Sequence, residues 1–146
     1  MLCGENSFLI DHGNVCCLNL VFDIFIDVLT HAVMDALVGA AALGDIGALF
    51  PDSDPAYRGA DSLKLLELVV EKVREQGYAV GNLDATVLCQ KPKLAPYIGS
   101  MREKIAAACS VSAEQVSVKA TTEEKLGFTG EGLGISAHCV CLLVKA

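Results

Sequence analysis

The segment 119–125, Lys-Ala-Thr-Thr-Glu-Glu-Lys, places two hydroxyl groups and two carboxylates between two ammonium groups. Hydroxyl and ammonium groups bind phosphate, and carboxylate oxygens are the ligands that Mg²⁺ prefers in proteins. The segment therefore predicts a site that holds phosphate together with a divalent cation.

A second candidate is the loop in which Lys91 and Lys93 flank Pro92. Two lysines on a rigid loop of an otherwise acidic chain indicate an anion site, although two solvated lysines explain the pattern equally well. Residues 50–54 place two aspartates beside prolines and could meet hydroxyls or a metal, but turn chemistry alone accounts for these residue types. Residues 127–134 are rich in glycine but match no Walker or GxGxxG phosphate loop.

A histidine on the first predicted helix is a candidate metal ligand. Asp27, His31 and Asp35 are spaced i, i+4 and i+8, so they share one helix face. A carboxylate beside an imidazole is a common way to orient a metal-binding histidine. A solvated polar face explains the spacing more simply, and one histidine does not make a zinc site, which takes three or four protein ligands.

The seven cysteines do not form a disulfide framework or a zinc finger. Their number is odd, Cys16 and Cys17 are adjacent, and Cys139 and Cys141 lack the spacing of a C-x₂-C pair. We expect reduced thiols, with Cys139 and Cys141 on one face of the last strand and His138 on the other.

The elements that position these residues follow from apolar periodicity. Residues from 27 onward predict a helix that ends near Gly44, residues 61–76 predict a second helix, and a third begins at about Pro96. Strands are predicted over 78–80 and 83–90, 116–120 and 135–144. We expect a single α+β domain, a roughly four-stranded sheet covered by about three helices.

Composition excludes several classes of protein. The chain has 146 residues, 53% of them hydrophobic, and a formal net charge of −7. Intrinsic disorder is excluded, and neither nucleic acid nor an anionic membrane is an expected partner. Residues 15–34 have the length of a membrane span, but Asn19, Asp23, Asp27 and His31 interrupt them, and no basic residue of a signal peptide precedes them. We expect a cytoplasmic protein.

Three long blocks resemble the 2-C-methyl-D-erythritol 2,4-cyclodiphosphate synthase family of the non-mevalonate isoprenoid pathway. They are residues 31–62 (HAVMDALVGAAALGDIGALFPDSDPAYRGADS), 77–98 (GYAVGNLDATVLCQKPKLAPYI) and 118–146 (VKATTEEKLGFTGEGLGISAHCVCLLVKA). The resemblance implies a homotrimer with active sites between neighbouring subunits. It also implies a cytidine diphosphate-linked substrate, 4-diphosphocytidyl-2-C-methyl-D-erythritol 2-phosphate, that cyclises with release of CMP.

The resemblance carries functional roles over to individual residues. It implies Zn²⁺ or another divalent metal at His31, Mg²⁺ or Mn²⁺ at Glu124, and transition-state stabilisation by Thr122. The loops around methylerythritol and its phosphates are Asp45, Ile46, Gly47, Phe50, Pro51, Asp52, Ser53 and Asp54. The cytidine wall is Cys89, Gln90, Lys91, Pro92, Lys93, Leu94 and Ala95, and the phosphate and metal cluster is Thr121, Thr122, Glu123 and Glu124. Phe128 matches a pocket residue, and Glu131 stands where many members carry a phosphate-binding Arg.

The first part of the chain departs from the family. Members begin with a strand that carries D-x-H and then H-S-D-G-D, whereas this chain has adjacent Asp11 and His12, and only Asp27 of the second motif. We therefore divide the chain into an atypical segment, residues 1–26, and a synthase-like domain, residues 27–146. The departure motivates an alternative function, a catalytically impaired member that binds cytidine nucleotide or acts as a structural trimer. A further alternative is a thiol-metal protein that uses Cys3, Cys16 and Cys17.

Overall fold

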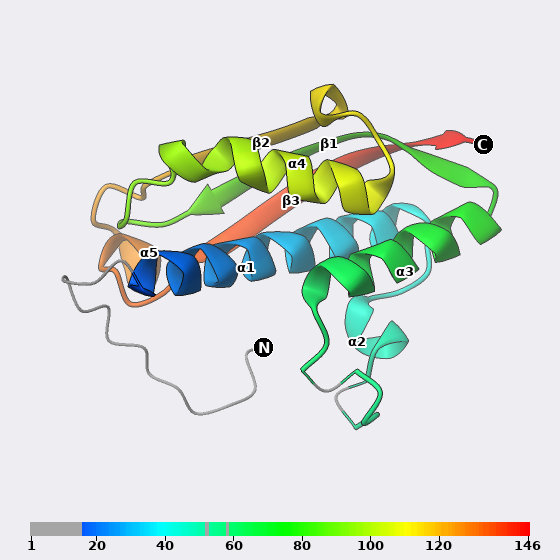
Figure 1. Cartoon of the computed structure of the whole chain (residues 1–146), viewed down its shortest axis with the longest axis horizontal. Coiled ribbons are helices and arrows are strands. Elements are labelled where there is room, and N and C mark those ends of the chain that lie inside the picture. Colours follow the sequence, from blue (N-terminus) through cyan, green and yellow to red (C-terminus); the bar gives the residue numbers. More distant parts are fainter. Residues whose placement is uncertain (1–15, 52, 58) are drawn as a thin grey trace.

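The three long helices of the computed structural model lie on one face of a three-stranded sheet (Figure 1). The structure describes residues 16–51, 53–57 and 59–146, with side chains from Phe22 onward. These helices are α1 (Cys16–Ala40), α3 (Ser62–Glu75) and α4 (Ile98–Cys109). Their apolar faces form one core with the inner face of the strands. The α+β class and the single domain are confirmed.

Helix α1 (Cys16–Ala40) begins earlier than the sequence pattern predicts. Phe25 and Ile26 are buried and continue the helical spacing that leads into Leu29 and Val33, so the apolar stretch before residue 27 extends the same helix. The helix ends at Ala40 rather than near Gly44, because the chain reverses where the Leu43 amide donates to the Val38 carbonyl at 2.9 Å.

Helices α3 (Ser62–Glu75) and α4 (Ile98–Cys109) confirm the other two predicted helices. The Asp61 carboxylate caps α3 by accepting from the Leu63 amide at 3.0 Å. A short 3₁₀ turn, Ala95–Tyr97, holds Pro96 in its first turn and leads directly into α4. Met101 is fully buried under the sheet, so α4 is anchored by its apolar face.

The sheet has the order β2-β1-β3, and the described residues contain three strands rather than about four. They are β1 (Tyr78–Leu88), β2 (Val116–Thr121) and β3 (Ser136–Lys145). The expected break at Gly81 is only a β-bulge, because β1 continues through it with a shift in register between Val80 and Asn82. β1 runs parallel to β2 and antiparallel to β3.

Two short helices were not expected. α2 (Ile46–Leu49) and α5 (Gly127–Gly130) each span four residues, which is too few to show a helical period. Both lie in stretches whose glycines, prolines or aspartates indicate loops. Asp45 caps α2 by accepting from the Ala48 amide at 2.8 Å, so the turn chemistry of this residue starts a helix.

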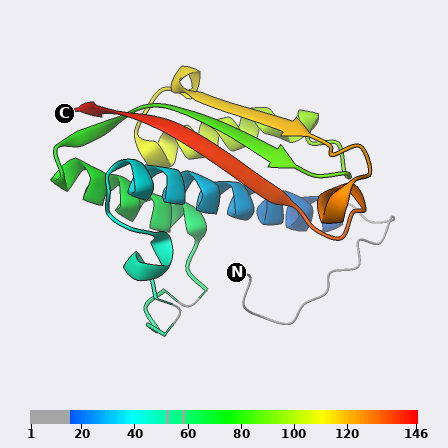
Figure 2. The ribbon, with the colours of Figure 1, turned by 180° about the vertical axis from the view of Figure 1, so that it is seen from behind.

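No helix or strand among the described residues covers the second face of the sheet, which we call the bare face (Figure 2). On β3 the side chains of Val140, Leu142 and Val144 point away from the helices and are exposed. Cys139 and Cys141 face the core and His138 points outward, as predicted. Among the helices in the described part of the chain, none is both long and apolar enough to cross a membrane.

Candidate functional site

A cavity of about 230 Å³ lies where β1 and β2 end side by side. Its lining comes from the loop after β1, the start of α4 and the end of β2, and consists of Cys89, Gln90, Pro92, Lys93, Leu94, Ala95, Ile98, Ala120, Thr121 and Thr122. The two strands are parallel, and Leu88 is paired with Thr121, so their carboxyl ends meet. Ligands commonly bind at this end of parallel strands. The cavity therefore joins two segments that the sequence marks separately.

The cavity combines an apolar wall with charge at its rim. Leu94 and Cys89 are buried, whereas Lys93 is exposed at the opening. The Cys89 thiol donates to the Pro92 carbonyl at 3.5 Å, and burial raises the pKa of this thiol above its ordinary value. Cys89 is therefore a neutral wall residue at physiological pH rather than a nucleophile. Lys91 is exposed and does not line the cavity.

One buried polar atom stands in this wall. Within the part of the chain that the structure describes, the side-chain oxygen of Gln90 is buried and has no hydrogen-bond partner. A buried acceptor without a partner is unfavourable. A ligand that donates a hydrogen bond to this oxygen would therefore be bound more tightly in the cavity.

The residues after β2 form a hydrogen-bonded loop. The Thr122 hydroxyl donates to Glu124 Oε1 at 2.9 Å, and both side chains are exposed at the edge of the cavity. The Thr121 hydroxyl donates to the Thr122 carbonyl at 3.4 Å. Hydroxyl groups and one carboxylate beside the cavity are suited to a phosphate with its cation. Glu123 has a different orientation, because it accepts from the hydroxyl of Thr129 on α5 at 2.8 Å.

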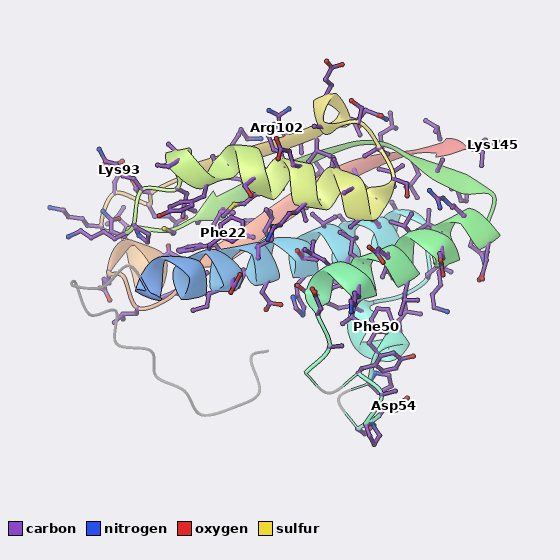
Figure 3. The ribbon with its side chains drawn as sticks, viewed as in Figure 1. Phe22, Phe50, Asp54, Lys93, Arg102 and Lys145 are labelled. Carbon is purple, nitrogen blue, oxygen red and sulfur yellow. The ribbon has the colours of Figure 1, made fainter. Side chains whose placement is uncertain are left out.

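The loops expected around methylerythritol lie far from this cavity in the same chain. Figure 3 shows Phe50 and Asp54 on the projecting α2 segment and Lys93 at the opposite end of the molecule. Phe50 is buried against Tyr57, with ring centroids 5.0 Å apart. Asp54 accepts from the Ala56 amide at 2.9 Å, which fixes the turn.

The other residues of these loops are arranged around α2. Asp45 is its cap, and the amide of Ile46 donates to Asp35 on α1 at 3.2 Å. Gly47, Pro51 and Ser53 are exposed, and Asp52 lies outside the described residues. One chain therefore does not bring this part of the expected substrate site to the cavity.

The His31 ring is held by the backbone of α1. Its Nδ1 lies 2.8 Å from the Asp27 carbonyl oxygen, which can only accept, so Nδ1 carries the proton. In the neutral ring Nε2 then keeps a lone pair. The Asp27 carboxylate is 3.7 Å from the same Nδ1.

A complete zinc site is not formed by the described residues. Across 16–51, 53–57 and 59–146, no three His, Cys, Asp or Glu side chains lie together as a metal site would require. His31 is one ligand, and zinc takes three or four. Asp11, His12 and Cys3 lie outside the described residues, as do the side chains of Cys16 and Cys17.

Two predicted site residues lie on or next to α5. The Phe128 ring is 57% exposed and packs over Gly134, where an added Cβ would lie 3.1 Å from the ring. Glu131 is exposed at the end of α5. Neither lines the cavity. Sequence reasoning missed Ile98 and Ala120 in the cavity wall and Thr129 as the partner of Glu123, because only the packing of α4, β2 and α5 brings them there.

The chain matches a known protein family and its curated members. The family model described as YgbB family matches residues 26–144. A 2-C-methyl-D-erythritol 2,4-cyclodiphosphate synthase from Trichlorobacter lovleyi is 65% identical over 118 residues, which cover 81% of this chain and 75% of the relative. The enzyme of the same name from Clostridium perfringens is 60% identical over 119 residues, covering 82% and 76% of the two chains.

Solved structures are also similar. The IspF–CDP complex from Plasmodium falciparum has a TM-score of 0.71 and 30% identity, and the match covers 81% of this chain and 70% of that chain. The bifunctional IspDF from Campylobacter jejuni has a TM-score of 0.78 and 41% identity. That match covers 82% of this chain and 32% of the bifunctional chain.

Proposed function

This chain belongs to the YgbB family, and from that membership we propose that it is a 2-C-methyl-D-erythritol 2,4-cyclodiphosphate synthase. It converts 4-diphosphocytidyl-2-C-methyl-D-erythritol 2-phosphate to 2-C-methyl-D-erythritol 2,4-cyclodiphosphate and CMP. The observation that carries the proposal is 65% identity to an enzyme of that name over four fifths of the chain. This degree of similarity supports an active synthase rather than the impaired alternative.

The reaction is an internal phosphoryl transfer. An oxygen of the 2-phosphate attacks the β-phosphorus and forms a new P–O bond. The bond from the β-phosphorus to the oxygen that it shares with the α-phosphorus breaks. CMP leaves with the electron pair of that bond. No covalent chemistry is required of the protein, so catalysis depends on a folded substrate, an in-line geometry and neutralised charge.

We assign the cytidine half of the substrate to the cavity at the ends of β1 and β2. Its apolar wall, with Leu94 and Ile98, suits a flat base, and Lys93 at the rim suits the phosphates that follow it. The structural relatives with bound CDP support a cytidine nucleotide as the ligand. Lys91, exposed beside this rim, would add positive potential rather than a wall contact.

Thr122 and Glu124 are placed for the diphosphate. Thr122 lines the cavity, and its single hydroxyl proton, which is donated to Glu124 in this structure, can be redirected to the charge that develops on the transferred phosphoryl group once the substrate is bound. The Glu124 carboxylate would hold Mg²⁺ or Mn²⁺, which supplies neutralisation of phosphate charge when bound. We further propose a divalent metal, Zn²⁺ in the family pattern, at His31. The described residues provide only this one ligand for it, so no chemical step is assigned to that metal.

We propose that the active enzyme is a homotrimer. The cavity and the α2 loops are far apart in one chain, so a complete substrate site needs loops from a neighbouring copy (Figure 3). The bare sheet face with exposed Val140, Leu142 and Val144 is an apolar surface that a second copy can cover. The net charge of −7 supports the expectation that neither nucleic acid nor an anionic membrane is a partner, and we propose a cytoplasmic location.

We also retain the division of the chain at residues 26 and 27. The family match begins at residue 26, which supports residues 27–146 as the synthase-like domain. Residues 1–26 remain the atypical segment in this proposal, although α1 continues across the boundary.

The direct test is release of CMP from the substrate in the presence of Mg²⁺ or Mn²⁺, against a blank with chelator. Equal amounts of CMP and cyclic diphosphate are expected. Thr122→Val should lower kcat by about 10²-fold because it removes one transition-state donor. Ser100→Ala, at an exposed position of α4, is the control and should retain activity.

The outcomes separate the candidate functions. Binding of CMP without any release above the blank would indicate the impaired member instead. If the protein neither bound nor released CMP, the assignment would be refuted. Elemental analysis of the purified full chain tests the metal at His31, since that site predicts about one Zn²⁺ per subunit, lost in His31→Ala.

A further inference from the structure

The turn after β2 has an unusual backbone. Glu124 and Lys125 have φ of 51° and 67°, and neither is glycine. The Leu126 amide donates to the Glu123 carbonyl at 2.9 Å and closes a four-residue turn around them. Positive φ at both central positions is the pattern of a type I′ turn, where asparagine and glycine are preferred. A turn of this kind persists only when the surrounding structure holds it.

Two contacts with α5 hold this turn. Glu123 Oε2 accepts from the hydroxyl of Thr129 at 2.8 Å, and Thr129 is only 1% exposed. Hydrogen bonds to carboxylates are among the stronger ones, and the Thr129 end of this one is closed to solvent. Gly130 lies directly against the backbone of Lys125, because a Cβ added to Gly130 would be 2.6 Å from the Lys125 carbonyl carbon.

The same turn aims the two residues that we assign to the diphosphate. Thr122 precedes Glu123 and lines the cavity, and Glu124 follows it and accepts from the Thr122 hydroxyl at 2.9 Å. The carboxylate of Glu123 is instead directed at α5. Rotation of the Glu123 backbone would therefore move Thr122 and Glu124 together, on either side of it.

We propose that Glu123 is a positioning residue, which through its bond to Thr129 holds Thr122 and Glu124 at the phosphates, and that it binds neither phosphate nor metal. The family resemblance groups Glu123 with the phosphate and metal ligands, so the structure separates it from that set. The inference rests on the proposed synthase function, because it concerns the residues placed at the diphosphate.

Four variants of the full chain separate a positioning residue from a ligand. Glu123→Gln keeps an acceptor for Thr129 and Glu123→Ala removes it, while Thr129→Ser keeps the donor and Thr129→Val removes it without changing the volume greatly. Glu75→Gln, an exposed carboxylate at the end of α3, is the control. For each protein we would measure kcat, KM, the Mg²⁺ concentration at half-maximal rate and the affinity for CMP.

A positioning role predicts that the two disruptive variants behave alike. Glu123→Ala and Thr129→Val should lower kcat by about 10-fold to 100-fold and raise the Mg²⁺ requirement, since a displacement of about 1 Å suffices for such losses. The affinity for CMP should change by less than about 3-fold, because the base lies at the other wall of the cavity. Glu123→Gln and Thr129→Ser should each retain activity within about 3-fold.

If Glu123 were instead a ligand of phosphate or metal, a different pair of variants would lose activity, and this result would overturn the inference. Glu123→Gln would then be as impaired as Glu123→Ala, because an amide is a poor ligand for Mg²⁺, and Thr129→Val would be as active as the wild type.

A measurement without substrate keeps this result separate from the proposed function. Hydrogen exchange of the Leu126 amide reports the turn itself, and we expect it to be at least about 10-fold faster in Glu123→Ala and Thr129→Val than in the wild type. Unchanged exchange would refute the positioning role. If the wild type released no CMP, the proposed function would fail, while this exchange would still decide what Glu123 does.

Discussion

Substitution of Gly130 by alanine tests the packing of α5 against the turn that carries Glu124. An added Cβ would lie 2.6 Å from the Lys125 carbonyl carbon and 2.9 Å from its Cα. Both atoms belong to the backbone, so no side chain can rotate away to make room. The nearer contact is about 0.8 Å short of an ordinary contact of 3.4 Å, so α5 or the turn must move by nearly that distance.

The expected cost follows from overpacking. Inserting one carbon into a closed contact destabilises a protein by about 1–3 kcal/mol. With a urea dependence of about 2 kcal/mol per molar for a chain of this size, Gly130→Ala should lower the unfolding midpoint by roughly 1 M. Displacement of Glu124 by a similar distance should also lower kcat by about 10-fold or more.

The assay is urea unfolding followed by circular dichroism, together with CMP release measured well below the unfolding midpoint. Protein concentrations must be equal, because the stability of an oligomer depends on concentration. Gly99→Ala in α4 is the matched control, since an added Cβ there has nothing within 4 Å. This control should be stabilised by about 0.5–1 kcal/mol, because alanine loses less backbone entropy in a helix than glycine does.

Equal midpoints for Gly130→Ala and the wild type would refute this argument, since they would mean that α5 does not approach the turn so closely. A destabilised variant with full activity would be equally informative, because it would separate the packing of α5 from the geometry of the phosphate site.

Three further predictions concern the cavity, the sheet face and the buried thiols. Lys93→Ala should weaken CMP binding by about 10-fold in calorimetry through loss of a charge-assisted hydrogen bond, and unchanged affinity would argue against the cavity as the nucleotide site. Leu142→Lys should yield monomers that release no CMP, as sedimentation would show, whereas Leu68→Lys on α3, with 41% exposure at the wild-type side chain, should remain assembled. Burial raises the pKa of Cys109 and Cys139 to about 12 from an ordinary 9.0, so the native state binds more protons than the unfolded state above pH 9. The free energy of unfolding should therefore fall between about pH 9 and pH 12, less steeply in Cys109→Ala, and a flat profile would contradict this burial.

Much of the fold could be predicted because its signals are local. The burial of Leu66, Val69 and Val73 follows from their spacing along α3, and the alternation of β3 places Cys139 and His138 on opposite faces, whatever the rest of the chain does. Helices α2 and α5 could not be predicted in this way, since four residues are too short to show a period. The sequence pattern predicts too late a start for α1, because the polar residues scattered through the apolar stretch before residue 27 hide the position at which the helix begins.

For the candidate site too, the local features could be predicted and those that depend on packing could not. Lysines, threonines and carboxylates in contiguous motifs pointed to phosphate chemistry from the sequence alone, because their chemical nature does not depend on the fold. The sequence could not show that residues 89–95 meet Thr121 and Thr122, since this depends on the parallel pairing of two strands whose partner residues are 33 positions apart, as in Leu88 and Thr121. Nor could it show that the α2 loops lie at the other end of the molecule, which makes a neighbouring copy necessary for a complete site.

By itself, the sequence determined the residue types available for chemistry, the main helices and strands, and the family to which the chain belongs. Only the tertiary structure decided how individual side chains are used. Glu123 and Glu124 are adjacent residues with the same side chain. Glu124 lies at the edge of the cavity and accepts from Thr122, whereas Glu123 accepts from Thr129 on α5. The difference arises from two left-handed residues and the close approach of Gly130 to Lys125, which are properties of packing that no local pattern encodes.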